Sequence, residues 1–191
     1  YIITDEYTNV LAQLIAPNAD YGTQEANNFC ISNPLAALFG SDVTEVCAGE
    51  AVSFFDQSTG SPVAWDWTLP GGTTADNTVQ NPVVTYNTPG TYDVTLWVDN
   101  GSSTDSQTIT TYITVHPNPT ASASGSDALC FGSCDGSGTA SASGGSPAYT
   151  YNWTGIGGGA NQNSLCAGTY EVIATDANGC VDTTSVTINE P

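Results

Sequence analysis

The chain of 191 residues contains no lysine and no arginine but 19 aspartate and glutamate residues, which gives a formal net charge of −19. This composition excludes nucleic-acid binding, because Lys and Arg are needed to displace the counterions of phosphate groups, and it excludes binding to anionic membranes for the same reason. A P-loop and a Schiff-base lysine are excluded as well.

The one-sided charge has a consequence for stability. Like charges repel one another, and dissolved salt or bound cations weaken that repulsion. We therefore expect stability to rise with ionic strength or with Ca²⁺. Two explanations for the missing cations are open, namely resistance to trypsin-like proteases, which cut after Lys or Arg, and adaptation to a salty medium.

The cysteines indicate the compartment. Six cysteines form an even set in a chain rich in Ser, Thr and Gly, which predicts three disulfides and a secreted, extracellular or cell-surface protein. Zinc binding is the alternative, but the single His116 lies in a Pro-rich segment and the closest cysteine pair is Cys130 and Cys134. The sequence lacks methionine and any apolar run of about 18 residues, so we expect no membrane insertion, and a chain that is a processed form or part of a longer protein.

Residues 1–32 are predicted to form an N-terminal arm with one helix at about residues 5–16. Apolar residues recur there with the spacing of one helical face, Thr4 or Asp5 can cap the start, and Pro17 stops the helix. The apolar stripe would pack on a neighbouring module of the same chain or on a neighbouring subunit. The stripe consists of Tyr7, Val10, Leu11, Leu14 and Ile15.

Residues 33–116 alternate between short β-rich runs and turn signals, a pattern typical of a β-sandwich. Asn100-Gly101 has the composition of a hairpin turn. The predicted strands cover residues 51–55, 63–67, 83–86, 91–98 and 107–115.

This segment resembles the PKD domain, an immunoglobulin-like surface module. The resemblance rests on Trp67 to Gly72, which is similar to the Trp-x-Phe-Pro-Gly-Gly variant of Bacteroidota with Leu69 in place of Phe, and on Asn81-Pro82 and Pro89 to Leu96. The aspartate usual in the family motif is missing here, so no role of that aspartate is transferred to this chain.

Residues 117–120 form a Pro-rich linker, which is predicted to be stiff and to hold two modules apart. Residues 121–191 form a second β module that resembles the SprB repeat, named for the gliding adhesin of Bacteroidota. The resemblance rests on Cys130-Phe131-Gly132, Cys134-Asp135-Gly136, Tyr149-x-Tyr151-x-Trp153, Gly168-Thr169-Tyr170 and Asn178-Gly179-Cys180.

The two modules share a sequence pattern. Gly-Thr-Tyr-x-Val recurs around Tyr92 and Tyr170, and each copy follows an earlier strand that carries a tryptophan, Trp67 or Trp153. We therefore predict an all-β fold of two tandem immunoglobulin-like β-sandwiches, each with its Tyr near a corner and its Trp in the core, behind a short N-terminal arm that contains one helix.

The sandwich topology suggests how the cysteines pair. The start of the second strand (B) lies beside the end of the antiparallel fifth strand (E) in such a fold, so Cys134 before B pairs with Cys166 after E. The other two pairs follow by elimination, which ties the arm to the first module. The predicted disulfides are Cys134–Cys166, Cys130–Cys180 and Cys30–Cys47.

No catalytic constellation is recognisable in the sequence. One histidine in a linker cannot supply a His-dependent triad within the modules, so we predict a protein that is not an enzyme. Scattered aspartates are the only candidates for a glycosidase-type carboxylate pair or for Ca²⁺, and the alternative is that they are ordinary solvated carboxylates. These candidates are Asp66, Asp93, Asp99 and Asp105, and no other cofactor is expected.

The sequence offers candidates both for sugar binding and for glycosylation. Trp65, Trp97 and Tyr151 could form a sugar-stacking surface, or they could serve core and module packing. Thr183 follows Asp182 in a short pattern that resembles the O-glycosylation signal of Bacteroidota, whereas the N-glycan patterns at Asn100 and Asn152 are weak evidence in a bacterial protein.

The combined expectation is an extracellular structural or adhesive protein that self-associates into a filament, a stalk or a tandem array and that could contact surface glycans. The resemblances imply a Bacteroidota protein exported by the type IX pathway and linked to gliding or adhesion. The alternative is a non-catalytic spacer or carbohydrate-binding appendage of a larger secreted hydrolase.

Overall fold

The computed structural model describes residues 2–4, 10–12 and 33–191. Every regular element in these residues is a β-strand, and none of them contains a helix long and apolar enough to cross a membrane. Residues 1–32 form one unit and residues 33–191 form another. In the first unit, β1 (Ile2–Thr4) pairs antiparallel with β2 (Val10–Ala12). Of the helix predicted at about residues 5–16, the structure describes only Val10–Ala12, which form β2; the rest lies outside the described residues.

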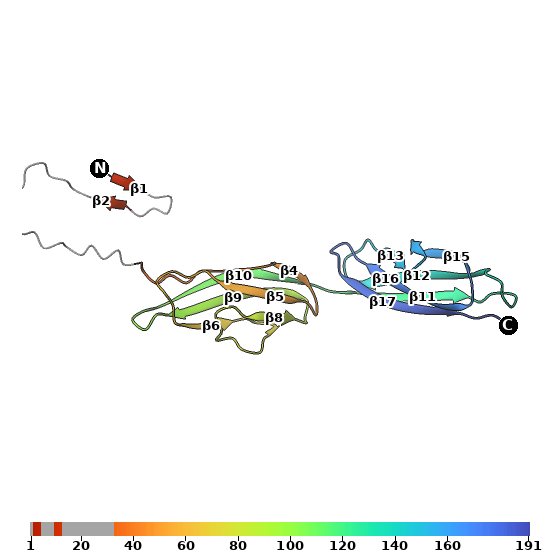
Figure 1. Cartoon of the computed structure of the whole chain (residues 1–191), viewed down its shortest axis with the longest axis horizontal. Helices are drawn as coiled ribbons and strands as arrows, with labels where there is room; N and C mark the ends of the chain where they lie inside the picture. The colour runs from red at the N-terminus through yellow and green to blue at the C-terminus, as the bar shows by residue number, and fades with distance from the viewer. Residues whose placement is uncertain (1, 5–9, 13–32) are drawn as a thin grey trace, which may run out of the picture. The chain divides into compact units, whose positions relative to one another are not determined.

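The first sandwich of the second unit consists of two facing sheets (Figure 1). One sheet has the strand order β4-β10-β9-β6 and the other has the order β3-β5-β8-β7. Only β4 pairs parallel, with the end of β10. The strands are β3 (Phe39–Ser41), β4 (Glu45–Cys47), β5 (Ala51–Asp56), β6 (Ala64–Thr68), β7 (Gly72–Thr73), β8 (Val83–Tyr86), β9 (Gly90–Asp99) and β10 (Thr104–His116).

The core of the first sandwich follows from the two-residue period of its strands. On β9, Val94, Leu96 and Val98 face inwards and are fully buried, while the residues between them face outwards. Trp67 on β6 is buried against Phe54 on β5, with ring centroids 5.6 Å apart. Burial of each such side chain stabilises the fold by roughly 1.5–3 kcal/mol, so this aromatic cluster supports the module.

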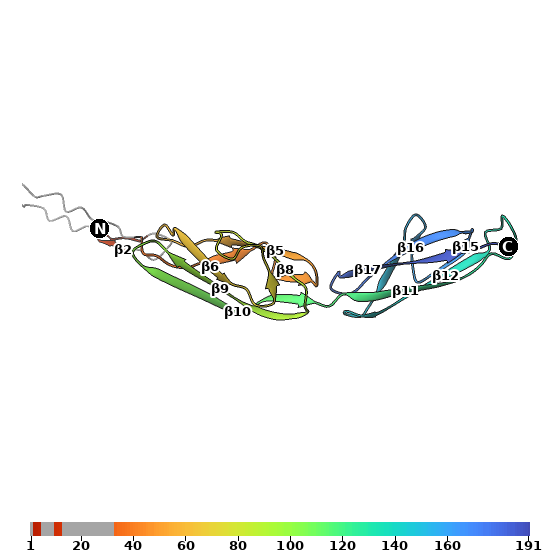
Figure 2. The same ribbon diagram turned by 90° about the horizontal axis from the view of Figure 1, so that it is seen from below.

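The second sandwich also has two facing sheets, which can be followed in Figures 1 and 2. The strand orders are β11-β12-β15 and β14-β13-β16-β17, and all pairs are antiparallel. The strands are β11 (Pro119–Ser126), β12 (Gly136–Gly144), β13 (Thr150–Trp153), β14 (Gly157–Gly158), β15 (Asn161–Leu165), β16 (Gly168–Thr175) and β17 (Val181–Ile188).

Small residues on β12 make room for the large core side chain of the second sandwich. Trp153 is fully buried, and a Cβ atom on Gly138 would lie 2.6 Å from its ring. The inward-facing Gly138 and Ala140 of β12 are therefore small because this strand lies close to the indole ring.

Both predicted tyrosine corners are present. The hydroxyl of Tyr92 donates to the carbonyl of Thr88 at 2.8 Å, and the hydroxyl of Tyr170 donates to the carbonyl of Cys166 at 2.9 Å. The recurring Gly-Thr-Tyr pattern thus marks the same structural position in both sandwiches, as in other immunoglobulin-like folds.

Candidate functional site at the junction of the two sandwiches

Two turns from different sandwiches meet where the chain passes from β10 to β11. β4 lies parallel to the end of β10 with Cys47 opposite His116, so the turn after β4 is beside the last residue of the first sandwich. In the second sandwich the turn at Asn178-Gly179 connects β16 to β17 and puts Cys180 directly before β17. Because β11 already begins at Pro119, inside the predicted linker, only two residues separate the modules.

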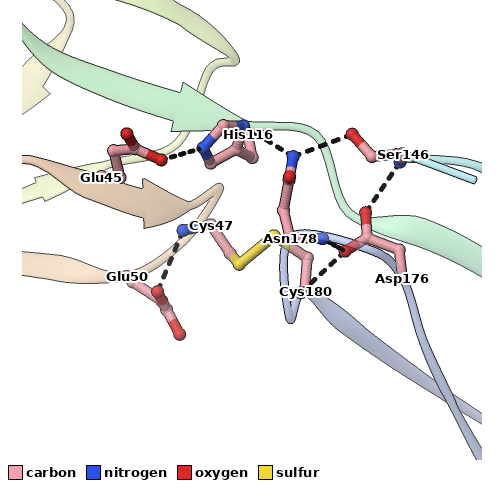
Figure 3. A network of polar contacts seen from close by, with 8 residues as sticks. All are labelled: Glu45, Cys47, Glu50, His116, Ser146, Asp176, Asn178 and Cys180. Carbon is pink, nitrogen blue, oxygen red and sulfur yellow. Dashed lines mark hydrogen bonds and ion pairs between the residues drawn. A yellow bond between two sulfur atoms is a disulfide. The ribbon is translucent and has the colours of Figure 1, made fainter.

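A disulfide joins Cys47 to Cys180 across this junction (Figure 3), with Cα atoms 5.5 Å apart and a sequence separation of 133. The side chain of Asn118 in the connection donates a hydrogen bond to the carbonyl of Ala48 at 2.9 Å. The sandwiches therefore have two covalent connections and are not merely spaced by a stiff linker. Two connections restrict hinge motion far more than one flexible linker does.

This bond corrects two of the predicted disulfides. Cys47 and Cys180 bond to each other, so the predicted pairs Cys30–Cys47 and Cys130–Cys180 are wrong. The loop of Cys130 lies at the other end of β17, since the N–H of Ala128 donates to the carbonyl of Asn189. The 8 residues of β17 span about 26 Å, whereas the Cα atoms of a disulfide lie within about 7 Å.

The second disulfide joins Cys134 to Cys166, the pair named from the sandwich topology. It ties the loop before β12 to the residue after β15, at the end of the second sandwich away from the junction. Cys130 is exposed and has no partner among the residues that the structure describes. Cys30 lies outside these residues.

A hydrogen-bond network accompanies the disulfide (Figure 3). The side-chain N–H groups of Asn178 reach the Nδ1 atom of His116 at 2.8 Å and the Oγ atom of Ser146 at 2.8 Å. Because the side-chain nitrogen of Asn178 can only donate, Nδ1 of His116 is the acceptor, and the N–H at Nε2 of the same ring donates to the carboxylate of Glu45 at 3.0 Å. Two residues of the first sandwich are thus linked to two of the second.

Asp176 organises the second sandwich side of the junction. Its carboxylate is 6% exposed and accepts backbone N–H groups of Ser146, Asn178 and Cys180 at 2.8–2.9 Å. Burial raises the pKa of Asp176, but these hydrogen bonds and the nearby His116 outweigh it and lower the pKa below its ordinary value of 3.8. The carboxylate therefore fixes the turn that carries Asn178 and Cys180.

The turn geometry also requires a glycine beside this carboxylate. Gly145 has a φ of +58°, and a Cβ atom there would lie 2.6 Å from Oδ2 of Asp176. A larger residue would push the loop away from Asp176. Gly145 thus has a structural reason at the junction.

The aspartates considered as Ca²⁺ ligands are not brought together. Asp93 accepts the N–H of Thr111 at 2.7 Å, Asp99 accepts that of Gly101 at 2.7 Å, and Asp105 accepts that of Ala37 at 2.8 Å. Across residues 2–4, 10–12 and 33–191, no group of three or more His, Cys, Asp or Glu side chains could hold a metal ion. These three carboxylates fix turns and loops of the first sandwich.

The aromatic candidates separate into two kinds. Trp65 is partly buried, packs on the first core and donates its indole N–H to Asp56 at 2.8 Å, and Tyr151 packs on the second core. Trp97 is 37% exposed on the outer face of β9. Trp97 alone of these three presents its ring to solvent.

The glycosylation candidates lie on the surface. Thr183 is an exposed residue of β17, and its modification stays a prediction. The side-chain oxygen of Asn100 accepts the backbone N–H groups of Ser102 and Ser103 at 3.0 and 2.9 Å, which explains its place in the hairpin turn without a glycan.

Sequence reasoning missed the junction as a site. In the sequence Asn178 stands out only as part of the repeat-like pattern and nothing marks Ser146, although Asp-x-Asn-Gly at Asp176 is typical of a side-chain-stabilised turn. The direction of the strands was the available signal, because it places the β16–β17 turn at the same end of the sandwich as the start of β11.

The comparisons with known proteins agree with this architecture. The family model of the PKD domain matches residues 32–115, which are the first sandwich. No curated protein matches the chain. Three solved structures can be aligned with most of this chain.

One is the C-terminal 282-residue fragment of intimin in complex with the intimin-binding domain of its translocated receptor, with a TM-score of 0.52, 13% identity and coverage of 80% of this chain and 63% of that one. The second is the eight N-terminal immunoglobulin domains of the Down Syndrome Cell Adhesion Molecule, with a TM-score of 0.51 and 11% identity. This match covers 81% of the present chain and 27% of that one. The third is the insect immune protein hemolin, with a TM-score of 0.48 and 14% identity. This match covers 86% of the present chain and 49% of that one. The chain therefore spans less than two thirds of each of these proteins, and the first two similarities establish an immunoglobulin-like fold.

Proposed function

We propose that this chain is an extracellular structural protein with an adhesive role, which contributes a stiff, disulfide-linked segment to a filament, stalk or tandem array. The observation that carries the proposal is the Cys47–Cys180 bond between two successive sandwiches. A bond inside one module stabilises that module, whereas a bond between modules limits how far they can move relative to each other, which matters for a protein that bears or transmits force.

Further observations support an extracellular role. Disulfides persist in oxidising compartments, and the first sandwich matches the PKD domain model. The similar structures of intimin and the Down Syndrome Cell Adhesion Molecule come from proteins named for adhesion or receptor binding. We extend this to the finer proposal of a Bacteroidota surface protein with a SprB-type second module, exported by the type IX pathway and linked to gliding.

The proposed mechanism of assembly is head-to-tail self-association through residues 1–32. A contact between two different surfaces does not close on itself and generates a fibre. The apolar residues of this arm would supply such a contact without bringing together the carboxylates of two chains that each carry a charge of −19.

Electron microscopy of the full chain tests the proposal. We expect ordered filaments from the full chain and dispersed particles from a variant that lacks residues 1–32. A Cys47→Ser, Cys180→Ser double variant is the control for the junction, and we expect it to form more flexible filaments. Dispersed monomers of the full chain, with or without Ca²⁺, would contradict the proposal and favour the alternative of a passive, non-catalytic spacer or appendage of a secreted hydrolase.

A further inference from the structure

The outer face of the sheet β4-β10-β9-β6 carries a solvent-facing tryptophan in a regular polar lattice. Trp97 on β9 lies directly opposite Asp66 on β6 and Ser106 on β10. The residues above and below in the same register also face outwards, since the intervening Leu96 and Val98 are buried. The lattice consists of the rows Ala64–Asp99–Thr104, Asp66–Trp97–Ser106 and Thr68–Thr95–Thr108.

Trp97 differs from the other tryptophans in its hydrogen bonding. The indole N–H groups of Trp65, Trp67 and Trp153 donate to Asp56, Val79 and Gly159, respectively, at 2.8, 3.1 and 2.9 Å. In the part of the chain that the structure describes, the Trp97 indole N–H has no protein acceptor, and its ring makes no contact with another aromatic ring. An apolar ring and an available donor are therefore presented together to the surroundings.

We infer that this face is a binding platform for a neutral polysaccharide, with Trp97 as the stacking residue. A sugar ring has an apolar face of C–H groups that can lie on an indole, and a rim of hydroxyls that both donate and accept. Thr104, Ser106, Thr108, Asp66 and Asp99 occupy the register positions on the same face beside and next to Trp97, and their hydroxyls and carboxylates supply the donors and acceptors that such a rim needs.

The polar groups around Trp97 are also held in place. The carboxylate of Asp66 accepts the side-chain N–H of Asn77 at 3.0 Å, and Thr95 and Thr108 are bonded through their hydroxyls at 2.8 Å. Partners built on paired strands of a sheet are better positioned than partners on loops. The lattice can thus bind a flat, extended ligand with little loss of side-chain freedom.

Charge decides which class of ligand fits. The two carboxylates and the net charge of −19 would repel an anionic glycan. A cationic peptide would suit the carboxylates and could lie on the indole through a cation–π contact, but its attraction to this exposed face would depend on charge and be lost in salt. A neutral sugar offers a C–H face to the indole ring and hydroxyls that donate to the carboxylates and accept from the indole N–H, whether the chain is a stalk subunit or an appendage.

Affinity electrophoresis of the full chain in gels that contain dextran, laminarin, xylan or mannan tests the inference. We expect retardation by at least one of these polysaccharides, and a Trp97→Ala variant should bind it at least about tenfold more weakly, which corresponds to about 1.4 kcal/mol. Trp97→Phe should retain most of the binding because it keeps a stacking ring. The control Phe131→Ala removes an aromatic ring that is 82% exposed in the second sandwich and should bind normally.

Two results would overturn the inference. One is the absence of retardation by all four polysaccharides, and the other is equal retardation of wild type and Trp97→Ala with an unchanged melting temperature. Binding to polylysine instead, weakened by Trp97→Ala and abolished by about 0.5 M salt, would assign the face to a cationic partner, because salt at that concentration screens charge attraction. Melting curves of all variants ensure that a loss of binding is not a loss of fold.

Discussion

Cys47 and Cys180 belong to different sandwiches, and their disulfide lies beside the hydrogen bond from Asn178 to His116 that also joins the two modules (Figure 3). The covalent and the polar links act on the same pair of turns. The disulfide limits how far the turns can separate, and the hydrogen bonds select one orientation within that limit. The junction is therefore the element on which a mechanical role of the chain depends.

Asp176 should be the most sensitive polar residue of the junction. Asp176→Ala leaves three backbone N–H groups without their acceptor in a buried place, and we expect a loss of about 2–4 kcal/mol in the unfolding free energy of the second sandwich. Urea titration followed by hydrogen exchange of the backbone amides of β13 and β16 measures it in the second sandwich alone. Asp182→Ala removes the acceptor of a single N–H, that of Ala121, and should cost less; equal losses would contradict this account.

The same carboxylate predicts a pH dependence. The pKa of Asp176 is lower in the folded protein than the ordinary 3.8, so its stabilising contribution is complete above that value and is lost as the pH falls below it. We expect wild type to lose more stability than Asp176→Asn between about pH 4 and pH 2. Parallel stability curves for the two proteins in acid would show that this carboxylate is not the acid-sensitive group.

Two tyrosines of the first sandwich offer a matched comparison. Among the residues that the structure describes, the buried hydroxyl of Tyr86 has no hydrogen-bond partner, and burial raises its pKa to about 12, whereas the hydroxyl of Tyr92 donates to the carbonyl of Thr88. Tyr92→Phe should cost about 1 kcal/mol, and Tyr86→Phe should be neutral or stabilising, because it removes an unsatisfied polar group. Calorimetric melting of both variants decides this, and a larger loss for Tyr86→Phe would indicate a buried partner.

Gly138 should resist substitution for steric reasons. A Cβ atom there would meet the ring of Trp153 at 2.6 Å, so Gly138→Ala should cost about 1–3 kcal/mol by overpacking. Gly158→Ala is the control, since its Cβ would lie 3.5 Å from the nearest atom, the carbonyl oxygen of Tyr151, which is an ordinary contact. Thermal melting should rank the two variants in that order, and the reverse order would be incompatible with the described core.

Salt should stabilise the whole chain. With 19 acidic residues and no Lys or Arg, repulsion among carboxylates opposes folding, and added ions screen it. We expect melting temperatures to rise with NaCl, and to rise equally with CaCl₂ and MgCl₂ at equal ionic strength. An increase specific to Ca²⁺ at low concentration would show that a site for this ion exists after all.

Local features of the fold could be predicted from the sequence. In the first sandwich β5, β6, β8, β9 and β10 follow from apolar runs and turn signals, whereas the short β3, β4 and β7 were not predicted. Trp67, Trp153, Tyr92 and Tyr170 occupy the predicted core and corner positions. These features depend on neighbours within one module, so a single sequence contains the information. The Cys134–Cys166 bond could be predicted for the same reason, because it follows from strand pairing inside one sandwich.

The junction could not be predicted in the same way. The prediction paired cysteines within each module or with the arm, and it treated residues 117–120 as a spacer. Whether Cys47 meets Cys180 depends on how one sandwich is placed against the other, which hydrophobic periodicity does not encode. The exposed position of Trp97, in contrast, follows from its alternation with Leu96 and Val98 once the strand register is known.

Disulfide mapping of the unreduced protein by mass spectrometry tests the central claim most directly. Trypsin has no site in this chain, but a protease that cuts after aromatic residues separates all relevant cysteines, since Phe131 lies between Cys130 and Cys134 and Tyr170 lies between Cys166 and Cys180. The account predicts a linked pair of peptides that contain Cys47 and Cys180. A bond from Cys47 to Cys30, or from Cys180 to Cys130, would contradict it.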